Sequence, residues 1–590
     1  MEKLMAKTSN TTRTVELLAV AVAMAAMALA LTGCETGDWD DPDYVVLQLE
    51  EGSTTQKHQA ISQLRHIPDE YRAEAAAVAS ELYLEEPRMR SDIMQRLIEW
   101  RLPEATDAYL EEVAGDHAGY GAAAARTLGE LEAEETIPDL IEIFGEIADH
   151  DRQAGILRGL SHMPDAGALD HAVGVLDLDV DNFPISLHRS ACYYIGALAA
   201  EEPEAITDEV RHKLAYARML MSETGGTVDE ACGLAIQQVG HAMIPELKLL
   251  FNEEHEEVRR LLMMYDDPLG DEHFTQNEAK QTAVEHLSAM RAPEAVELYI
   301  EELETEVEEP DLVSASRPAW RHTQSSIINE MLFGLGDIGD PEARPVLERV
   351  VQGDTFGDEW EILMTPAAGF QMLQDAARAL ARLGDRDARS TLLEMTDAEI
   401  FPPMARAFQA AEERDEPIPL TEQLRPQWLA AQAFVYLGEA DDRSEIESLA
   451  DDIEDEDLSE KLESFLVAFD VMDECEDIGD ESERAECFGE FLEHDEEHAR
   501  EKAALELSRM SPEAAGPVVA NAIDTDDLEL RETLTFAAYR VPSPELSDRI
   551  ADILDAESGE GGSEYQIDHH RLRMLYAWLE NQDADDVAGN

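Results

Sequence analysis

One pattern recurs along most of this chain: two amphipathic helices separated by a short break that contains Pro, Gly or Asp. The clearest pairs are residues 121–131 with 136–147, 279–290 with 295–303, 325–335 with 343–351, 373–383 with 388–395, 498–510 with 514–523, and 529–539 with 546–554. A single pair has one apolar stripe that it cannot bury alone, so successive pairs must stack. The pattern therefore predicts an all-α protein over residues 53–580, with no strand of consequence.

The repeats resemble a known family. Gly121–Leu131 (GAAAARTLGEL) and Leu373–Leu383 (LQDAARALARL), the latter followed by Gly384-Asp385, are similar to HEAT repeats of the short Ala-rich PBS-lyase type. This resemblance implies a HEAT-like α-solenoid, a right-handed superhelix of helical hairpins. It lies in the repeat alone and transfers no chromophore chemistry.

Gly and Pro mark the expected helix ends within these repeats. Gly336 and Gly384 are predicted to end first helices, because Gly adopts the left-handed conformation at little cost. Pro138, Pro293 and Pro512 stand near the starts of second helices, where a missing N–H matters least.

Four connections are longer than the repeat requires, and they lie near residues 263–274, 305–321, 352–367 and 397–427. Insertions in solenoids cluster on one face and often shape the binding surface. The sequence predicts partner contacts on these insertions and on the inner helices, without naming the residues.

The N-terminus has the features of an export signal. A basic start is followed by the apolar run Leu17–Leu31, which is shorter than the roughly 20 residues that span a bilayer. The run ends in Leu31-Thr32-Gly33-Cys34, which resembles the lipobox of bacterial lipoproteins. The resemblance implies removal of the signal peptide 1–33 and lipidation of Cys34 by a diacylglycerol and further acyl chains such as palmitate, and two or more chains anchor firmly.

The residues next to the anchor and at the far end complete the predicted organisation. Glu35 is not the Asp that resembles an inner-membrane retention signal, so the outer membrane is slightly favoured. Residues 34–52 are expected to hold the lipidated Cys and an acidic tether, and residues 581–590 a flexible acidic tail. The folded body is expected in the periplasm or at the cell surface.

The charge is extreme, with 44 basic and 131 acidic residues and a formal net charge of −87. Such a chain is repelled by nucleic acid and by anionic lipid, so neither is expected as a partner. Two interpretations stay open: an acidic surface for a basic partner or divalent cations, or adaptation of the whole surface to salt. Acids occur in every repeat and Lys is scarce, which is typical of halophilic proteins and favours the second.

The cysteines other than Cys34 fall into two pairs. Cys475 and Cys487 flank a turn between two helical stretches, and in an oxidising compartment they either form a disulfide or face apart. Cys192 and Cys232 each follow an Ala at the same point of successive repeats. They are predicted to be small, unbonded core residues.

One segment could carry metal chemistry. His494, Glu497 and His498 fit the H-x-x-E-H pattern of a zinc-protease family, in which two His hold zinc and Glu activates water. Asp495, however, is expected to be an N-cap, which places His494 before the helix. We therefore predict no metal site, no catalytic residues and no cofactor. The chain also lacks a phosphate-binding Gly loop and a G-x-S-x-G elbow.

These features favour a non-enzymatic, membrane-anchored scaffold of the bacterial cell envelope that binds an unidentified protein or peptide. Two alternatives remain. One is a metal-dependent hydrolase that uses the HDEEH segment of residues 494–498, and the other is a self-associating assembly or structural factor of the envelope, since the oligomeric state is unknown.

Overall fold

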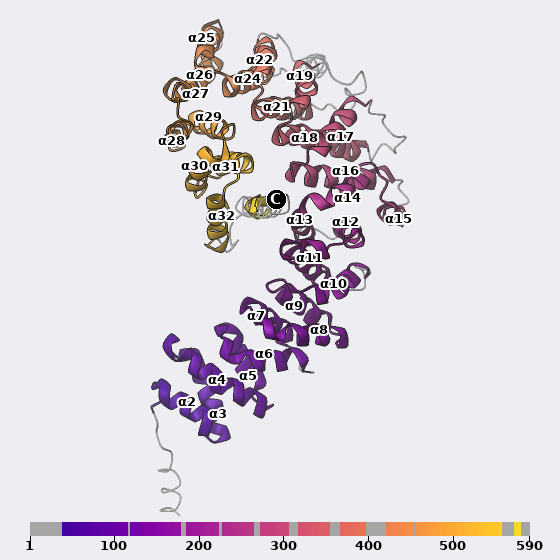
Figure 1. The fold of residues 1–590 in the computed structure, drawn as a ribbon, viewed down its shortest axis with the longest axis vertical. Helices are drawn as coiled ribbons and strands as arrows, with labels where there is room; N and C mark the ends of the chain where they lie inside the picture. The colour runs from indigo at the N-terminus through magenta and orange to yellow at the C-terminus, as the bar shows by residue number, and fades with distance from the viewer. Residues whose placement is uncertain are drawn as a thin grey trace, which may run out of the picture. The chain divides into compact units, whose positions relative to one another are not determined.

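The computed structural model describes residues 38–115, 119–178, 184–222, 227–264, 272–305, 317–353, 366–396, 420–452, 456–556, 571–576 and 578–579. These residues are helical throughout, with no strand among them, and the predicted all-α solenoid of HEAT-like hairpins is confirmed (Figure 1). The signal peptide, Cys34 and the tail 581–590 lie outside the described residues.

The chain divides into two compact units, unit 1 (Met1–Ile147) and unit 2 (Ala148–Asn590). In unit 1 the even-numbered helices form one layer, and α3, α5 and α7 form the other. The helices are α2 Pro42–Glu51, α3 Thr54–Gln63, α4 Asp69–Glu85, α5 Arg90–Trp100, α6 Thr106–Ala114, α7 Gly121–Glu130 and α8 Ile137–Glu146.

Unit 2 repeats this two-layer plan over most of its length. One layer, the inner layer, runs through α9, α11, α13, α16, α18, α21 and α24 and continues with α27, α29 and α31; the remaining helices pack behind it. The helices of its first half are α9 His150–Leu160, α10 Leu169–Leu176, α11 Ile185–Glu201, α12 Asp208–Ser222, α13 Thr227–Val239, α14 Ile244–Phe251, α15 Glu256–Met264, α16 Glu272–Ala289, α17 Glu294–Glu304, α18 Arg317–Ile338 and α19 Arg344–Gln352.

The helices of the second half of unit 2 are α21 Pro366–Leu383, α22 Arg389–Thr396, α24 Leu420–Leu437, α25 Arg443–Asp452, α26 Glu456–Phe465, α27 Val467–Cys475, α28 Glu481–Phe491, α29 Glu497–Leu507, α30 Pro512–Ala522, α31 Leu528–Arg540 and α32 Pro544–Ala556. The last of these helices share a continuous apolar core of buried residues between Val471 and Leu579. In the described residues, no helix combines the length and the apolar character needed to cross a membrane.

A 3-10 turn often separates the two helices of a hairpin, and its third residue is a buried alanine. Ala105, Ala168, Ala343 and Ala388 are each 0–1% exposed. The larger set of turns is η2 Pro103–Ala105, η3 Glu134–Thr136, η4 Ala166–Ala168, η5 Pro203–Ala205, η7 Pro341–Ala343, η8 Arg386–Ala388 and η10 Ala440–Asp442. Only a small side chain fits where the chain turns between the two layers.

The Gly-Asp motif before these turns has a defined role. Gly384 has a φ of 72°, as predicted, and Asp385 then accepts the backbone N–H of Asp387 at 3.0 Å. The prediction for Gly336 is wrong, because α18 continues to Ile338 and Gly339 takes the positive φ of 78°. Gly336 instead lies where a Cβ would stand 2.6 Å from the Cα of Ala379, so the absence of a side chain lets α18 and α21 meet.

The acidic tether predicted over residues 34–52 is corrected over residues 42–51, which form α2. Asp41 caps this helix by accepting the N–H of Asp43 at 3.2 Å, and Val45, Val46 and Leu49 are buried. The apolar spacing within an acidic stretch was sufficient to fold it onto α3 and α4. The solenoid therefore begins before residue 53.

Helices extend into the ends of the predicted insertions, so these connections are shorter than expected. Residues 317–321 belong to α18, residues 366–367 to α21, and residues 420–427 to α24, which carries Pro426 inside it. The remaining parts of these connections lie outside the described residues.

Candidate functional site

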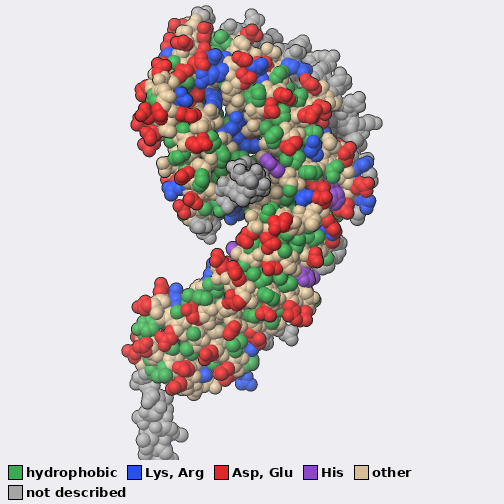
Figure 2. All heavy atoms as spheres, in the orientation of Figure 1, with side chains coloured by type: hydrophobic (Ala, Val, Ile, Leu, Met, Phe, Trp, Pro, Cys, Tyr) green, Lys and Arg blue, Asp and Glu red, His purple; other side chains and the backbone are tan. Residues whose placement is uncertain are grey.

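The inner layer of unit 2 turns back on itself, so that α31 lies against helices that precede it by about 200 residues. The guanidinium of Arg540, at the end of α31, donates to the backbone oxygen of Gly336 at 2.9 Å and of Asp337 at 3.2 Å. Arg291, just after α16, donates to the oxygen of Asp337 at 2.9 Å and of Phe536 at 3.5 Å. In Figure 2 the basic side chains gather in the hollowed centre of unit 2, whereas acidic side chains cover its rim.

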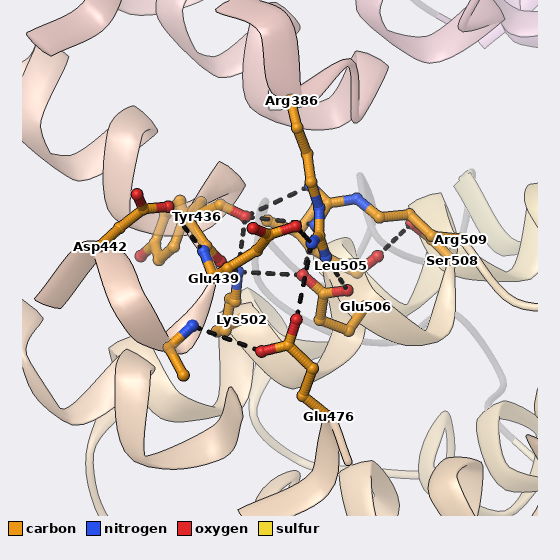
Figure 3. Close-up of polar contacts among 12 residues, drawn as sticks. Arg386, Tyr436, Glu439, Asp442, Glu476, Lys502, Leu505, Glu506, Ser508 and Arg509 are labelled. Atoms are coloured by element: carbon orange, nitrogen blue, oxygen red, sulfur yellow. Dashed lines mark hydrogen bonds and ion pairs between the residues drawn. The ribbon is translucent and has the colours of Figure 1, made fainter. Parts of the chain in front are cut away.

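A second set of such contacts joins α29 and the residues after it to the ends of α21 and α24. Figure 3 shows Lys502 and Arg509 beside Tyr436 and Glu506. The Lys502 ammonium donates to the backbone oxygens of Val435, Tyr436 and Gly438 at 3.4, 3.0 and 2.7 Å. Arg509 donates to the oxygens of Ala381 at 2.8 Å and Tyr436 at 3.3 Å. The last carbonyls of a helix carry partial negative charge, so these two cations cap the ends of α21 and α24.

The charge of this cluster is balanced by Glu506. Its carboxylate lies 2.9 Å from the Lys502 ammonium, and Lys502 is 0% exposed. Burial lowers the pKa of Lys502 to about 8. Burial alone would raise the pKa of Glu506, but Arg509 and Lys502 outweigh it and lower that pKa to about 2. Because Lys502 is enclosed and its donors are taken, the cluster holds helices together and does not present a nucleophile.

A cavity of about 320 Å³, here called the polar cavity, opens beside this cluster between α21, α24, α29 and α31. Its lining includes Gln374, Arg378, Gln432, Arg500 and Glu532. Arg378 lies 3.4 Å from Glu532 and keeps 36% of its side chain exposed. The cavity thus offers amide, guanidinium and carboxylate groups from four helices.

One wall of the polar cavity is ordered by a buried hydrogen-bonded group. The Tyr436 hydroxyl lies between the Glu501 carboxylate and Nδ1 of His498, 2.9 Å from the latter. Burial raises the pKa of Glu501 and lowers that of His498. Both groups are therefore shifted toward their neutral forms, which suits a wall packed against aromatic rings.

The HDEEH segment is placed differently from a zinc motif. His498 lies in the first turn of α29 with its ring edge-on to Phe465 at 4.7 Å, while Nδ1 of His494, before the helix, accepts the N–H of Glu496 at 3.0 Å. The N-cap is Glu496, not Asp495 as predicted. The two imidazoles thus have separate partners.

The cysteine pairs differ from expectation in one case. Cys475 and Cys487, whose bond the sequence left open, are joined by a disulfide, with Cα atoms 5.7 Å apart. Cys192 and Cys232 are buried as predicted, but they are also bonded, with Cα atoms 5.0 Å apart, so the expectation of unbonded thiols is wrong. Equivalent positions in adjacent repeats face each other across α11 and α13, a relation that the forty-residue spacing could have indicated.

A cluster that the sequence did not reveal joins α12, α14 and the residue before α15. Nδ1 of His212 lies 2.9 Å from the Glu246 carboxylate, and Nε2 of His255 lies 3.8 Å from it. The two rings stack at 3.9 Å with an interplanar angle of 5°. Parallel rings direct their lone pairs in parallel planes, and Nδ1 of His255 accepts the N–H of Val258 at 3.3 Å. In this arrangement the cluster ties three helices together, and its three potential ligand atoms lie within 4.8 Å of one another.

Comparison with known proteins agrees with this architecture. The family profile of PBS lyase HEAT-like repeats matches residues 122–146, which are the α7–α8 hairpin. No curated protein matches the sequence. The class is thereby defined: the chain contains a HEAT-like repeat, and its described residues form a solenoid of such hairpins.

The chain is also similar to solved structures. They include Kap121p bound to Pho4p (10% identity, TM-score 0.42), where the match covers 92% of this chain and 64% of that one. Kap121p bound to the extreme C-terminus of the phosphatase Cdc14p has 11% identity and a TM-score of 0.41, with 96% and 68% covered. A structure on cadherin and beta-catenin has 12% identity and a TM-score of 0.30, with 90% and 99% covered. The chain spans about two thirds of the length of the Kap121p chains, and likenesses this distant transfer no function.

Proposed function

We propose that this chain is a non-enzymatic scaffold, anchored in the bacterial envelope through Cys34, that binds a protein or peptide on the inner layer of unit 2. The polar cavity carries the proposal. It lies on the inner layer of a solenoid, and its lining groups come from four separate helices. Solenoids recognise partners along such inner surfaces, with affinity spread over many contacts.

The charge and size of the polar cavity limit which part of a partner can bind there. A volume of about 320 Å³ admits one or two side chains of a partner rather than a whole folded element. Arg378 is partly exposed and its ion pair with Glu532 is long, so it remains able to meet an acidic or amide side chain. Gln374 and Gln432 add uncharged donors and acceptors.

The test is affinity capture from the native envelope at high salt with the mature chain as bait. Gln374→Trp fills the cavity, and Arg378→Ala removes its exposed cation. Arg549→Ala is the matched control, since this arginine is 41% exposed and paired only with Asp524 at the surface. We expect one stoichiometric protein with the wild type and the control, and its loss with Gln374→Trp. Equal recovery with all baits would contradict a partner site in this cavity.

The anchor is tested separately. Cys34→Ser removes the thiol at the predicted processing site, so the protein should lose incorporation of labelled palmitate and keep its signal peptide. Cys475→Ser is the control for a generic effect of cysteine loss. Incorporation of palmitate into the Cys34→Ser protein would contradict the lipid anchor and leave the scaffold proposal standing.

A further inference from the structure

A second cavity, here called the acidic cavity, lies between α16, α18, α21, α31 and residues 571–576. Its volume is about 530 Å³. Part of its wall is apolar, from Ala289, Phe333, Phe536, Tyr539 and Met574. The rest carries five carboxylates, from Glu285, Glu330, Asp337, Asp375 and Glu532, and three guanidinium groups, from Arg291, Arg382 and Arg571.

Two of these carboxylates are neutralised within the protein. Asp337 lies 2.7 Å from the guanidinium of Arg382, and Arg291 is 4.0 Å away. Glu532 lies 3.0 Å from Arg571 and 3.4 Å from Arg378. The cations that line the cavity are therefore already committed. Glu285 has only a distant contact, 3.5 Å from Arg218.

The remaining two acids form no ion pair with the described residues. Glu330 makes no hydrogen bond or ion pair with the described residues, and Asp375 accepts only from the amide of Gln371, at 2.9 and 3.2 Å. Next to Glu330, the side-chain oxygen of Asn329 is buried and accepts no hydrogen bond. Buried acceptors of this kind are rare in native proteins and call for a donor.

The pKa values of Glu330 and Asp375 reflect their burial without an ion pair. Burial raises the pKa of Glu330 to about 7, and the charges of Glu285, Asp337 and Asp375 add to the effect. No cation contributes to the shift of Glu330. Burial likewise raises the pKa of Asp375 to about 6, against the opposing charges of Arg378 and Arg382. At neutral pH the cavity must therefore hold protons or take up positive charge.

The spacing of the acceptors selects the type of cation. Among the described residues, the group of side chains close enough to share one metal ion is His212, Glu246 and His255, which lies outside this cavity. A larger cation with several donors fits better. An ammonium group has three N–H donors, which the carboxylate oxygens of Glu330 and Asp375 can accept. Its alkyl chain would lie along Phe333 and Met574.

We propose that the acidic cavity binds a primary ammonium group, carried either by a free amine or by a lysine side chain of a partner. Glu330 and Asp375 supply the charge. The two cavities share Glu532, but Glu330 and Asp375 line the acidic cavity alone, and the proposal stands whether or not the chain binds a protein at the polar cavity.

The experiment is calorimetric titration of the full, detergent-solubilised chain at pH 8 in 1 M NaCl. At that salt exposed charges are screened beyond about 3 Å, so buried pairing dominates. One arm uses 1,5-diaminopentane and the other Nα-acetyl-lysine amide, with Nα-acetyl-norleucine amide as the uncharged reference. Binding of the diamine alone assigns a free amine, and binding of the lysine amide alone assigns a partner side chain. Binding of both supports the ammonium site for either source.

Two variants make the assignment specific. Glu330→Gln keeps the shape but removes the charge, and it should weaken ammonium binding by about 30-fold or more, as loss of a buried charged partner does. Asp375→Asn is the second variant, in case the first does not fold. Glu342→Gln, on the exposed turn after α18, is the control and should bind as the wild type does.

The pH dependence gives a further check. Binding should strengthen from pH 5 to pH 8, because Glu330 and Asp375 lose their protons over this range while the amine stays charged. The proposal is overturned if neither amine binds at pH 8, if the norleucine amide binds as tightly as the lysine amide, or if Glu330→Gln and Glu342→Gln bind alike.

Discussion

Unit 1 and unit 2 are built from the same hairpin, yet they differ in what they bury. Among the described residues of unit 1, one charged side chain is buried, that of Glu112. Its carboxylate accepts a hydrogen bond from the hydroxyl of Tyr83 on a neighbouring helix. Unit 2 buries Arg152, Arg218, Arg382, Lys502, Glu506 and Arg531. Its buried cations often contact helices far away in the sequence.

The difference follows from geometry. When a helix packs only on its neighbours, its terminal carbonyls can face water. When the inner layer turns back on itself, as at α18 and α31, helix ends are enclosed, and enclosed carbonyls must find donors. Arg291, Lys502, Arg509 and Arg540 provide them. Long-range closure, and not the hairpin itself, is what requires buried charge.

The largest expected effect is that of Lys502→Met. This change leaves three carbonyls without their donor and Glu506 with less neutralisation, and breaking a buried pair in this way costs about 3–5 kcal/mol. Hydrogen exchange should accelerate in α24 and α29 and stay unchanged in α4 and α6. Lys213→Met, which removes a more exposed pair with Asp177, should change exchange little. Faster exchange in α4 and α6 would contradict the expectation that the effect of Lys502→Met is confined to unit 2.

Reduction of the disulfides should also act on unit 2 alone, since both bonds lie there. In the chain-entropy model the bond between Cys192 and Cys232, 40 residues apart, is worth about 4 kcal/mol, and the one between Cys475 and Cys487, 12 apart, about 3 kcal/mol. Paired Ser substitutions at each site, followed by urea unfolding, measure the two contributions. A larger loss from the shorter loop would contradict this order.

The repeats were predictable because each depends on local pattern. Apolar spacing, the Gly384-Asp385 motif and Pro at second-helix starts all act within a few residues, and the predicted pairs match helices α7–α8, α16–α17, α18–α19, α21–α22, α29–α30 and α31–α32. The errors arose where the structural role of a residue depends on a contact with a residue far away in the sequence. Gly336 reads as a helix end in sequence, but the close approach of Ala379 sets its role.

The candidate sites could not be predicted for the same reason. Glu330, Asp375 and Glu532 stand on three helices spread over 200 residues, and nothing local separates them from the many exposed acids of this chain. The positive charge of the inner surface could not be predicted either, since a net charge of −87 does not indicate a centre rich in arginine. A weak signal did exist: Arg378 and Arg382 lie four residues apart on one face of α21, and Arg386 follows in the turn after it.

A smaller effect concerns pH. Because burial raises the pKa of Glu330 from 4.5 to about 7, the folded state binds more protons than the unfolded state between these values. The stability of unit 2 should therefore fall as pH rises from about 4.5 to 7, by about 2 kcal/mol once partial exposure is allowed for. Glu330→Gln should flatten this decline in urea unfolding measured across the range. An unchanged slope in the variant would show that another group is responsible.

The smallest effects ask whether tight packing belongs to unit 2 as a whole or to its inner layer. Gly336→Ala, in inner-layer helix α18, places a Cβ 2.6 Å from the Cα of Ala379, and the overpacking should cost about 1–2 kcal/mol after the gain in helix propensity. Gly174→Ala lies in α10, behind the inner layer, where a Cβ meets nothing within 4 Å. It should be neutral or stabilise by up to about 1 kcal/mol. If both variants lose stability equally in urea unfolding, close approach is general in unit 2; opposite signs assign it to the layer that turns back on itself.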